Sequence, residues 1–156
     1  MWQRVQTLYL AVSAILTLVM LLSVKAVAYT SDGAVMEEYK YLTYAPFAIL
    51  LIIILILEIL SITTYKIRVF QYRTTILTAL VTLGFQIWLG AEFFVNLHAA
   101  AEGGAKIIYR LNVVFPLVCV ILDVLAARGI LADQLLVESV SRLREDRRTK
   151  NKKGNH

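Results

Sequence analysis

The chain has 156 residues, a formal net charge of +5 and a mean hydropathy of +0.70. Hydrophobic residues make up 59% of it and charged residues only 17%, whereas soluble proteins carry about 25% charged residues. This composition excludes an ordinary soluble domain and indicates one small membrane-embedded bundle. No nucleic-acid-binding motif accompanies the basic residues, so we expect no nucleic-acid partner.

The first apolar segment spans about residues 6–24 and has a basic residue on each side. A basic start followed by Ala26-Val27-Ala28 resembles a signal peptide with its cleavage site. The segment is long for a signal peptide, however, and Gln6, Ser13 and Thr17 share one helical face, as in a helix that packs against others. We therefore expect a retained membrane helix and keep cleavage as the alternative.

The second apolar segment, about residues 45–64, follows a polar, acidic stretch that we interpret as a loop with a turn at Ser31-Asp32-Gly33. Residues 45–62 carry one charge, Glu58. As a helix they would be about 27 Å long, close to the thickness of the hydrocarbon core of a bilayer. This segment is the clearest membrane-spanning helix in the sequence.

Two further apolar segments follow, at about residues 75–97 and 107–127. Pro116 predicts a kink in the last of them. Residues 129–144 keep an amphipathic rhythm that predicts a cytoplasmic helix on the membrane surface or on the connector before residue 75. Residues 145–156 are basic and lack apolar side chains, so we expect a disordered tail.

The distribution of basic residues predicts the topology. With both termini in the cytoplasm, the cytoplasmic segments would hold twelve of the sixteen Lys and Arg residues, as the positive-inside rule requires. We therefore predict an all-α fold: a four-helix transmembrane bundle over residues 1–128, with both termini cytoplasmic and a short amphipathic cytoplasmic C-terminal helix.

Charged side chains inside a membrane are candidates for function by default. Glu58 and Asp123 lie at similar depths near the cytoplasmic ends of their helices, and Arg4 can reach the same level with its long side chain. We predict an intramembrane cluster of Arg4, Glu58 and Asp123. The alternatives are that each group reaches the headgroups separately, or that the two acids share a proton as in proton-coupled carriers.

Near the outer side, Glu92 could form a structural ion pair with Arg110 or Lys106. His98 and His156 are far apart, and Cys119 is the single cysteine, so we expect no metal, no cofactor and no disulfide. The sequence also lacks the nucleophile, phosphate-loop and dinucleotide motifs of common enzymes. We expect a protein that is not an enzyme.

Two stretches resemble a bacterial family called domain of unknown function 4293, which comprises small four-pass membrane proteins. QRVQTLYL at residues 3–10 is similar to the family's opening QRIQxxYL, and residues 126–144 are similar to its pattern AxRxIxxDExLVRSxDRLR. The matching positions in the second stretch are Ala126, Arg128, Ile130, Asp133, Leu136, Val137, Ser139, Arg142, Leu143 and Arg144. Gln134, Glu138 and Ser141 depart from it. The resemblance implies a bacterial inner-membrane protein and supplies no activity.

The sequence leaves two hypotheses for function. The first is a non-enzymatic scaffold or accessory subunit, whose cytoplasmic helix and basic tail contact another membrane protein or anionic lipid headgroups. The second is a small proton-coupled carrier that works as a homo-oligomer around Glu58 and Asp123. The lipid bilayer is a partner under both hypotheses, and the sequence does not decide which further partner the protein has.

Overall fold

A computed structural model describes residues 2–29, 34–103 and 106–153 of the chain. Within these ranges some residues are described by their backbone alone, namely 2–4, 36, 97, 99–103, 106, 143 and 145–153. The described part contains four α-helices, three short strands and one 3₁₀ turn.

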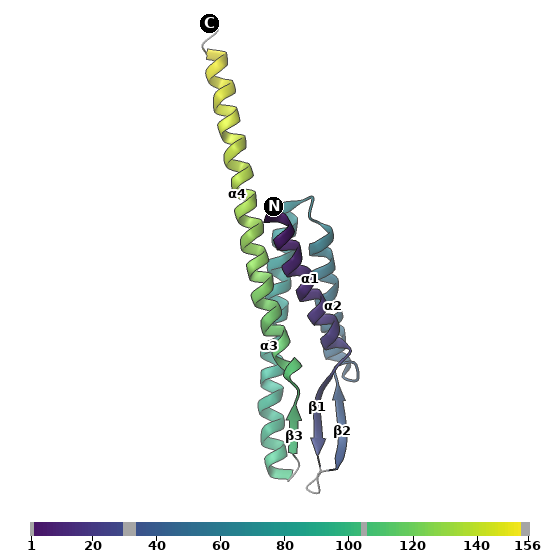
Figure 1. Ribbon diagram of the computed structural model, residues 1–156. Coiled ribbons are helices and arrows are strands. Elements are labelled where there is room, and N and C mark those ends of the chain that lie inside the picture. The colour runs from purple at the N-terminus through teal and green to yellow at the C-terminus, as the bar shows by residue number, and fades with distance from the viewer. Residues whose placement is uncertain (1, 30–33, 104–105, 154–156) are drawn as a thin grey trace.

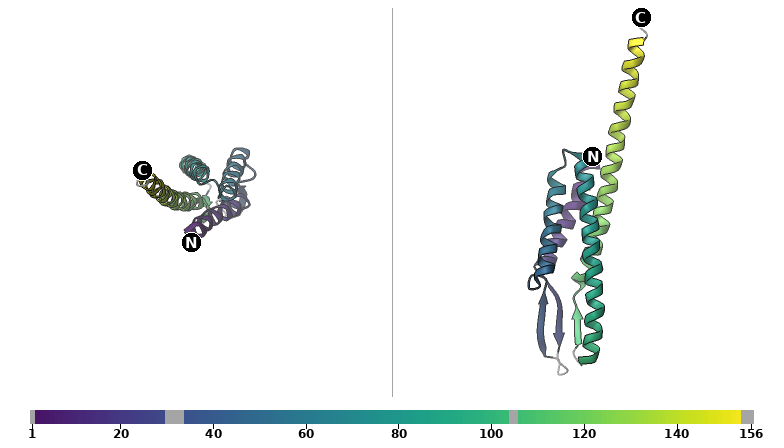
Figure 2. Two further views of the ribbon diagram at one scale, coloured as in Figure 1. Left: turned by 90° about the horizontal axis from the view of Figure 1, so that it is seen from above. Right: turned by 180° about the vertical axis from the view of Figure 1, so that it is seen from behind.

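The four helices form an up-down-up-down bundle in which each helix packs against two neighbours (Figures 1 and 2). They are α1 (Trp2–Leu21), α2 (Ala45–Thr63), α3 (Arg68–Gly103) and α4 (Phe115–Lys153). Contacts run from α1 to α2, from α2 to α3, from α3 to α4 and from α4 back to α1, so the helices enclose one common core.

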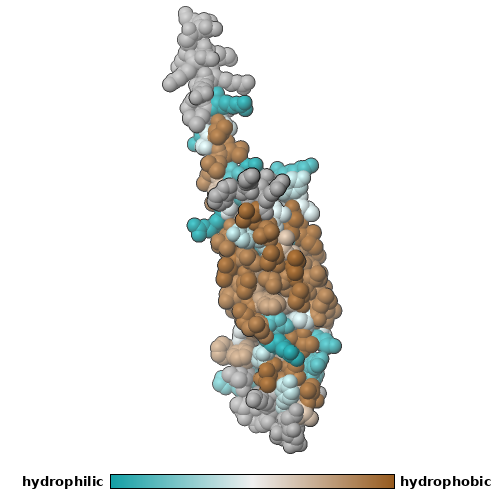
Figure 3. All heavy atoms as spheres, in the orientation of Figure 1, coloured by the Kyte–Doolittle hydropathy of each residue, from teal (hydrophilic) through white to brown (hydrophobic). Residues whose placement is uncertain are grey.

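Three helical stretches are long and apolar enough to cross a membrane: Ala45–Thr63, Arg68–Asn96 and Leu111–Arg142. Only 28 to 33% of their most apolar windows is buried within the protein, so most of that apolar surface points outward. On the face that Figure 3 shows, it forms a continuous apolar band across the middle of the bundle. The apolar part of α1, Val5–Leu21, is shorter. An apolar band of this kind is what a bilayer covers.

The prediction of an all-α fold was incomplete, because a three-stranded antiparallel sheet lies at the end of the bundle opposite the two termini (Figure 1). Its strands are β1 (Val24–Tyr29), β2 (Val35–Lys40) and β3 (Lys106–Tyr109), in the order β2-β1-β3. The segment that we interpreted as a loop thus supplies two strands. Their β-branched and aromatic residues on both sides of a turn sequence are typical of a hairpin.

The fourth apolar segment does not begin as a helix. It starts with β3 and a 3₁₀ turn, η1 (Leu111–Val114), and α4 begins only at Phe115. Pro116 therefore lies in the first turn of α4 and does not kink it, because the N–H that proline lacks has no intrahelical partner at that position.

The helices also extend past the predicted boundaries. The connector before residue 75 belongs mostly to α3, which starts at Arg68. α4 passes without a break through the predicted separate helix at 129–144 and through residues 145–153, which we expected to be disordered. At about 1.5 Å per residue, a helix of 39 residues is roughly 58 Å long, well beyond a bilayer core of about 30 Å.

The bundle interior differs between its two ends. Towards the sheet, the core is apolar and contains edge-on aromatic contacts around Phe47. Towards the termini, buried polar side chains line the helix contacts. Ser61 of α2 and Thr75 of α3, for example, have hydroxyl oxygens 2.5 Å apart. Hydroxyl pairs of this type hold helices together where the apolar effect is absent.

Candidate functional site

The first candidate site is the inner carboxyl cluster, which consists of Glu58, Asp123 and the three side chains around them, Ser13, Thr17 and Cys119. Glu58 of α2 is completely buried. Its Oε1 accepts hydrogen bonds from Ser13 Oγ at 2.8 Å and from Thr17 Oγ1 at 3.0 Å, both on α1. Ser13 and Thr17 are four residues apart, so one face of α1 presents both hydroxyls to a single carboxyl group.

Asp123 of α4 is also completely buried and lies within electrostatic range of Glu58. Neither of its carboxyl oxygens, nor Oε2 of Glu58, has a hydrogen-bond partner within the described residues. One turn before Asp123, the sulfur of Cys119 lies 3.8 Å from Thr17 Oγ1 and 3.7 Å from the carbonyl oxygen of Ser13. The cluster therefore joins α1, α2 and α4 around two acids.

Two of the three predicted members of the intramembrane cluster thus lie together. The side chain of the third, Arg4, is outside the described residues, so its place in the cluster stays a prediction. The side chains described here contain no group of three or more His, Cys, Asp or Glu residues that could hold a metal ion. Glu58 and Asp123 form a pair of carboxyl groups that could take up or release a proton.

The second candidate site lies beneath the sheet, where Lys25 Nζ is 2.7 Å from Glu92 Oε1. The Lys25 side chain is 6% exposed and that of Glu92 27%. The ammonium also lies 4.8 Å from the centre of the Phe47 ring, a cation–π contact. Lys25 is therefore held by a carboxylate and by an aromatic face, as a buried cation requires.

A β-bulge explains how Lys25 reaches this position. In the pairing of β1 with β2, Val24 is opposite Lys40 and Ala26 is opposite Tyr39, so Lys25 is the extra residue. A bulge turns the side chain of its extra residue away from the regular alternation. Lys25 and Ala26 consequently both face α3, and Glu92 meets Lys25 from that helix.

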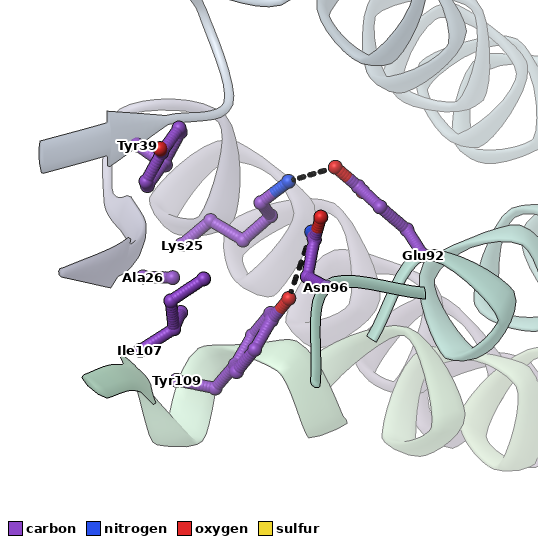
Figure 4. A pocket seen from close by; sticks show the side chains of 7 residues that line it. All are labelled: Lys25, Ala26, Tyr39, Glu92, Asn96, Ile107 and Tyr109. Atoms are coloured by element: carbon purple, nitrogen blue, oxygen red, sulfur yellow. Dashed lines mark hydrogen bonds and ion pairs between the residues drawn. The ribbon is translucent and has the colours of Figure 1, made fainter. Parts of the chain in front are cut away.

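A pocket, which we call the outer pocket, adjoins this ion pair and encloses about 100 Å³ between the sheet and α3 (Figure 4). Its lining residues are Lys25, Ala26, Tyr39, Glu92, Asn96, Ile107 and Tyr109. Lys25 and Glu92 point toward one another across it, and Asn96 Nδ2 donates to Tyr109 Oη at 3.0 Å. Glu92 Oε2 is buried and has no hydrogen-bond partner in the described part of the chain.

Two tyrosines lie within electrostatic range of Glu92. Burial raises the pKa of Tyr109, the hydrogen bond from Asn96 lowers it, and the negative charge of Glu92 raises it further. Burial also raises the pKa of Tyr41 far above its usual value, again with a contribution from Glu92. Both hydroxyls therefore stay neutral at physiological pH and offer hydrogen bonds without charge.

The predicted ion pair between Glu92 and Arg110 is wrong, because Glu92 binds Lys25. Arg110 is exposed, and its backbone N–H donates to the carbonyl oxygen of Lys25 at 3.0 Å. Lys106, the other predicted partner, is described by its backbone alone. The sequence interpretation placed Lys25 in a solvated loop, and recognition of the hairpin would have shown that this lysine can turn inward.

At the opposite end of the molecule, α4 leaves the bundle. Arg68 at the start of α3 forms a salt bridge of 3.2 Å with Asp133 of α4. From Leu135 to Arg144, every side chain that the structure describes is exposed. Leu136 and Val140 are among them, with 65% and 62% of their surfaces exposed.

The apolar band, the long helices and the buried charged clusters define a small helical membrane-associated protein with a sheet at one end. The model of the family named domain of unknown function (DUF4293) matches residues 2–143, and the chain belongs to this family. That match confirms the resemblance found in the sequence. No curated protein and no solved structure matched the chain.

Proposed function

We propose that the protein crosses the bacterial inner membrane four times, with both termini and the free end of α4 in the cytoplasm and the sheet outside. The up-down-up-down order of the helices supports this topology, because it places both termini at one end and the sheet at the other. The distribution of Lys and Arg supports the choice of the cytoplasmic end. In this proposal α1 also crosses the membrane. Its apolar stretch within the described residues is Val5–Leu21, and the length of that stretch is close to the lower limit for a membrane span.

Its function in this proposal is that of a non-enzymatic accessory subunit, which binds a partner membrane protein through the free end of α4. The observation that carries the proposal is the set of apolar side chains left exposed there, Leu135, Leu136, Val137 and Val140. Exposed apolar surface of this kind marks an interaction site. On the other side of the same helix, Glu138 and Arg142 form an ion pair of 2.7 Å, which is typical of a solvent-facing side.

Site-specific photo-crosslinking in cells tests the proposal. A crosslinking residue at Val140 should capture one partner reproducibly, and the same residue at Glu138 should capture little, because the two positions are about 200° apart around the helix. The variant Val140→Asp should abolish co-purification of that partner while the protein still reaches the membrane. Equal capture at both positions, or capture of lipid alone, would contradict the proposal.

A second candidate function is that of a small proton-coupled carrier. It is favoured by one observation, the two completely buried carboxyl groups of the inner carboxyl cluster, which have three oxygens without hydrogen-bond partners in the described residues. Neighbouring acids in such a place can hold a proton between them. The bundle of one copy is small, so this function would need a homo-oligomer.

Proton flux into liposomes separates the two functions. Under the carrier hypothesis, Glu58→Gln and Asp123→Asn should each remove a flux that the unchanged protein supports, and Glu138→Gln should not. If the unchanged protein gives no more flux than empty liposomes, the carrier hypothesis is wrong and the accessory function stands on the crosslinking result.

A further inference from the structure

The outer pocket has the features of a binding site for a polar molecule. At about 100 Å³ it is several times larger than the roughly 10–15 Å³ that one water molecule needs. It is lined by an ion pair, an amide and two tyrosines. Pockets that combine apolar walls with a few convergent polar groups are the usual sites for small ligands.

The polar atoms around the pocket determine what it can bind. Glu92 Oε2 is buried and has no donor within the described residues, so the Glu92 carboxylate has capacity left to accept an N–H from a ligand that enters the pocket. The Lys25 ammonium has three N–H groups; one is used by Glu92 Oε1 and the Phe47 ring covers another side. Tyr109 accepts the hydrogen bond from Asn96, which leaves its own hydroxyl hydrogen for an acceptor.

The charges then limit the ligand to one class. Lys25 and Glu92 neutralise each other, and a ligand with a net charge would have to be desolvated without compensation. A molecule with both a positive and a negative end avoids this cost, because its cation can lie at Glu92 and its anion at Lys25 and Tyr109. A hydrogen bond to the Glu92 carboxylate further requires a cation that carries N–H groups.

We propose that the outer pocket binds a zwitterionic group with a primary ammonium and an oxyanion, held between Glu92 on one side and Lys25 with Tyr109 on the other. Ethanolamine phospholipid headgroups and free glycerophosphoethanolamine share this chemistry, because both join one ammonium to a phosphodiester with a single negative charge. The pocket lies at the end of the span Arg68–Asn96, at the level where headgroups meet the protein. This inference does not depend on the partner proposed for α4.

Native mass spectrometry of the full chain in detergent tests the proposal with three probes: short-chain phosphatidylethanolamine, phosphatidylcholine of the same chain length, and glycerophosphoethanolamine. We expect at least fivefold tighter binding of the ethanolamine lipid, because the quaternary ammonium of choline has no N–H for Glu92. Glu92→Gln should remove this preference, and Glu38→Gln, at an exposed carboxylate on β2, should keep it. Binding of glycerophosphoethanolamine in competition with the lipid would identify a soluble ligand as the source, and its failure to compete would identify the headgroup.

Equal binding of the two lipids by the unchanged protein, or a preference that survives Glu92→Gln, would show that the pocket holds water only. If Glu92→Gln does not fold, the variant Tyr109→Phe tests the proposal in its place, because it removes only the hydroxyl group and keeps the Lys25–Glu92 ion pair and the aromatic ring. We expect Tyr109→Phe to weaken binding of the ethanolamine lipid severalfold. Unchanged binding by this variant would overturn the proposal.

Discussion

The molecule buries charged groups in two regions and satisfies them differently. Beneath the sheet, the carboxylate of Glu92 has the ammonium of Lys25 at 2.7 Å. In the inner carboxyl cluster, Glu58 receives two hydroxyl hydrogen bonds, and Asp123 has no hydrogen-bond partner in the described residues. One region is thus an ion pair, and the other is a pair of acids supported by neutral donors.

The two regions differ in whether the charges of their buried groups are fixed or can change by the gain or loss of a proton. An ion pair with good geometry fixes both partners in their charged forms, and removal of one partner leaves an uncompensated charge. Two acids side by side cannot both ionise cheaply, so their proton count responds to the environment. We infer that the Lys25–Glu92 pair mainly holds the sheet on the bundle, and that the inner carboxyl cluster is the region suited to a change of state.

The largest effect on the free energy of unfolding should follow from removal of one partner of the Lys25–Glu92 ion pair. Lys25→Met keeps most of the side-chain volume but leaves Glu92 without its cation, so we expect a loss of about 3 kcal/mol in the free energy of unfolding. Thermal melting in detergent measures it. The double variant Lys25→Met/Glu92→Met should recover most of the loss. A loss no larger than that of Lys40→Met, at an exposed lysine of β2, would contradict a structural role for the pair.

In the inner carboxyl cluster, removal of a neutral donor should cost less. Ser13→Ala deletes one of the two hydrogen bonds to Glu58, and interhelical hydrogen bonds of this kind contribute about 0.6 kcal/mol on average and up to about 1.7 kcal/mol. We expect a loss of about 1 kcal/mol, measured by melting as before. Ser139→Ala on the exposed part of α4 is the control and should change nothing. A loss as large as that of Lys25→Met would mean that the two regions do not differ.

Much of this fold could be predicted from the sequence. The helix around Glu58 followed from hydropathy and segment length, and the meeting of Glu58 with Asp123 followed from their similar depth. These predictions depend on local periodicity and on the length of a bilayer, which act on each segment separately. The helix of residues 45–64 accordingly agrees closely with α2, Ala45–Thr63.

The sheet and its ion pair could not be predicted in the same way. β1 and β3 are about 80 residues apart in the chain, and nothing local to Lys25 indicates that it is the extra residue of a bulge. Charge and a location near the outer side suggested Arg110 or Lys106 as the partner of Glu92. The end of α4 was also missed, because residues 145–153 have no apolar face to give a helical signal.

A smaller effect is expected when an acid of the inner carboxyl cluster is made neutral. Glu58→Gln keeps a side-chain oxygen that can accept from Ser13 and Thr17 while it removes one carboxyl group beside Asp123. We expect a change in the free energy of unfolding within about 1 kcal/mol, because an isosteric swap that preserves the acceptor loses little. A loss near 3 kcal/mol would show that Glu58 is ionised and paired with a cation.

The smallest effect at neutral pH should come from Tyr41, which is buried near the ion pair and whose hydroxyl has no hydrogen-bond partner in the described residues. Tyr41→Phe should leave stability at pH 8 unchanged, since the lost hydroxyl makes no bond there. Burial raises the pKa of Tyr41 above its usual value of 10.0, so above pH 10 the unfolded chain loses this proton while the folded chain keeps it. Stability of the unchanged protein should therefore fall as the pH rises from 10 to 11.

Melting curves at pH 8 and pH 11 measure this difference. Tyr41→Phe should lose less stability between the two values than the unchanged protein does, and Tyr65→Phe, at an exposed tyrosine, should lose as much. An equal loss in all three proteins would mean that Tyr41 ionises as easily in the folded chain as in the unfolded one. Burial would then not hold the proton of Tyr41, and Tyr41 would give no support to the contrast between a buried ion pair and an exchangeable acid pair.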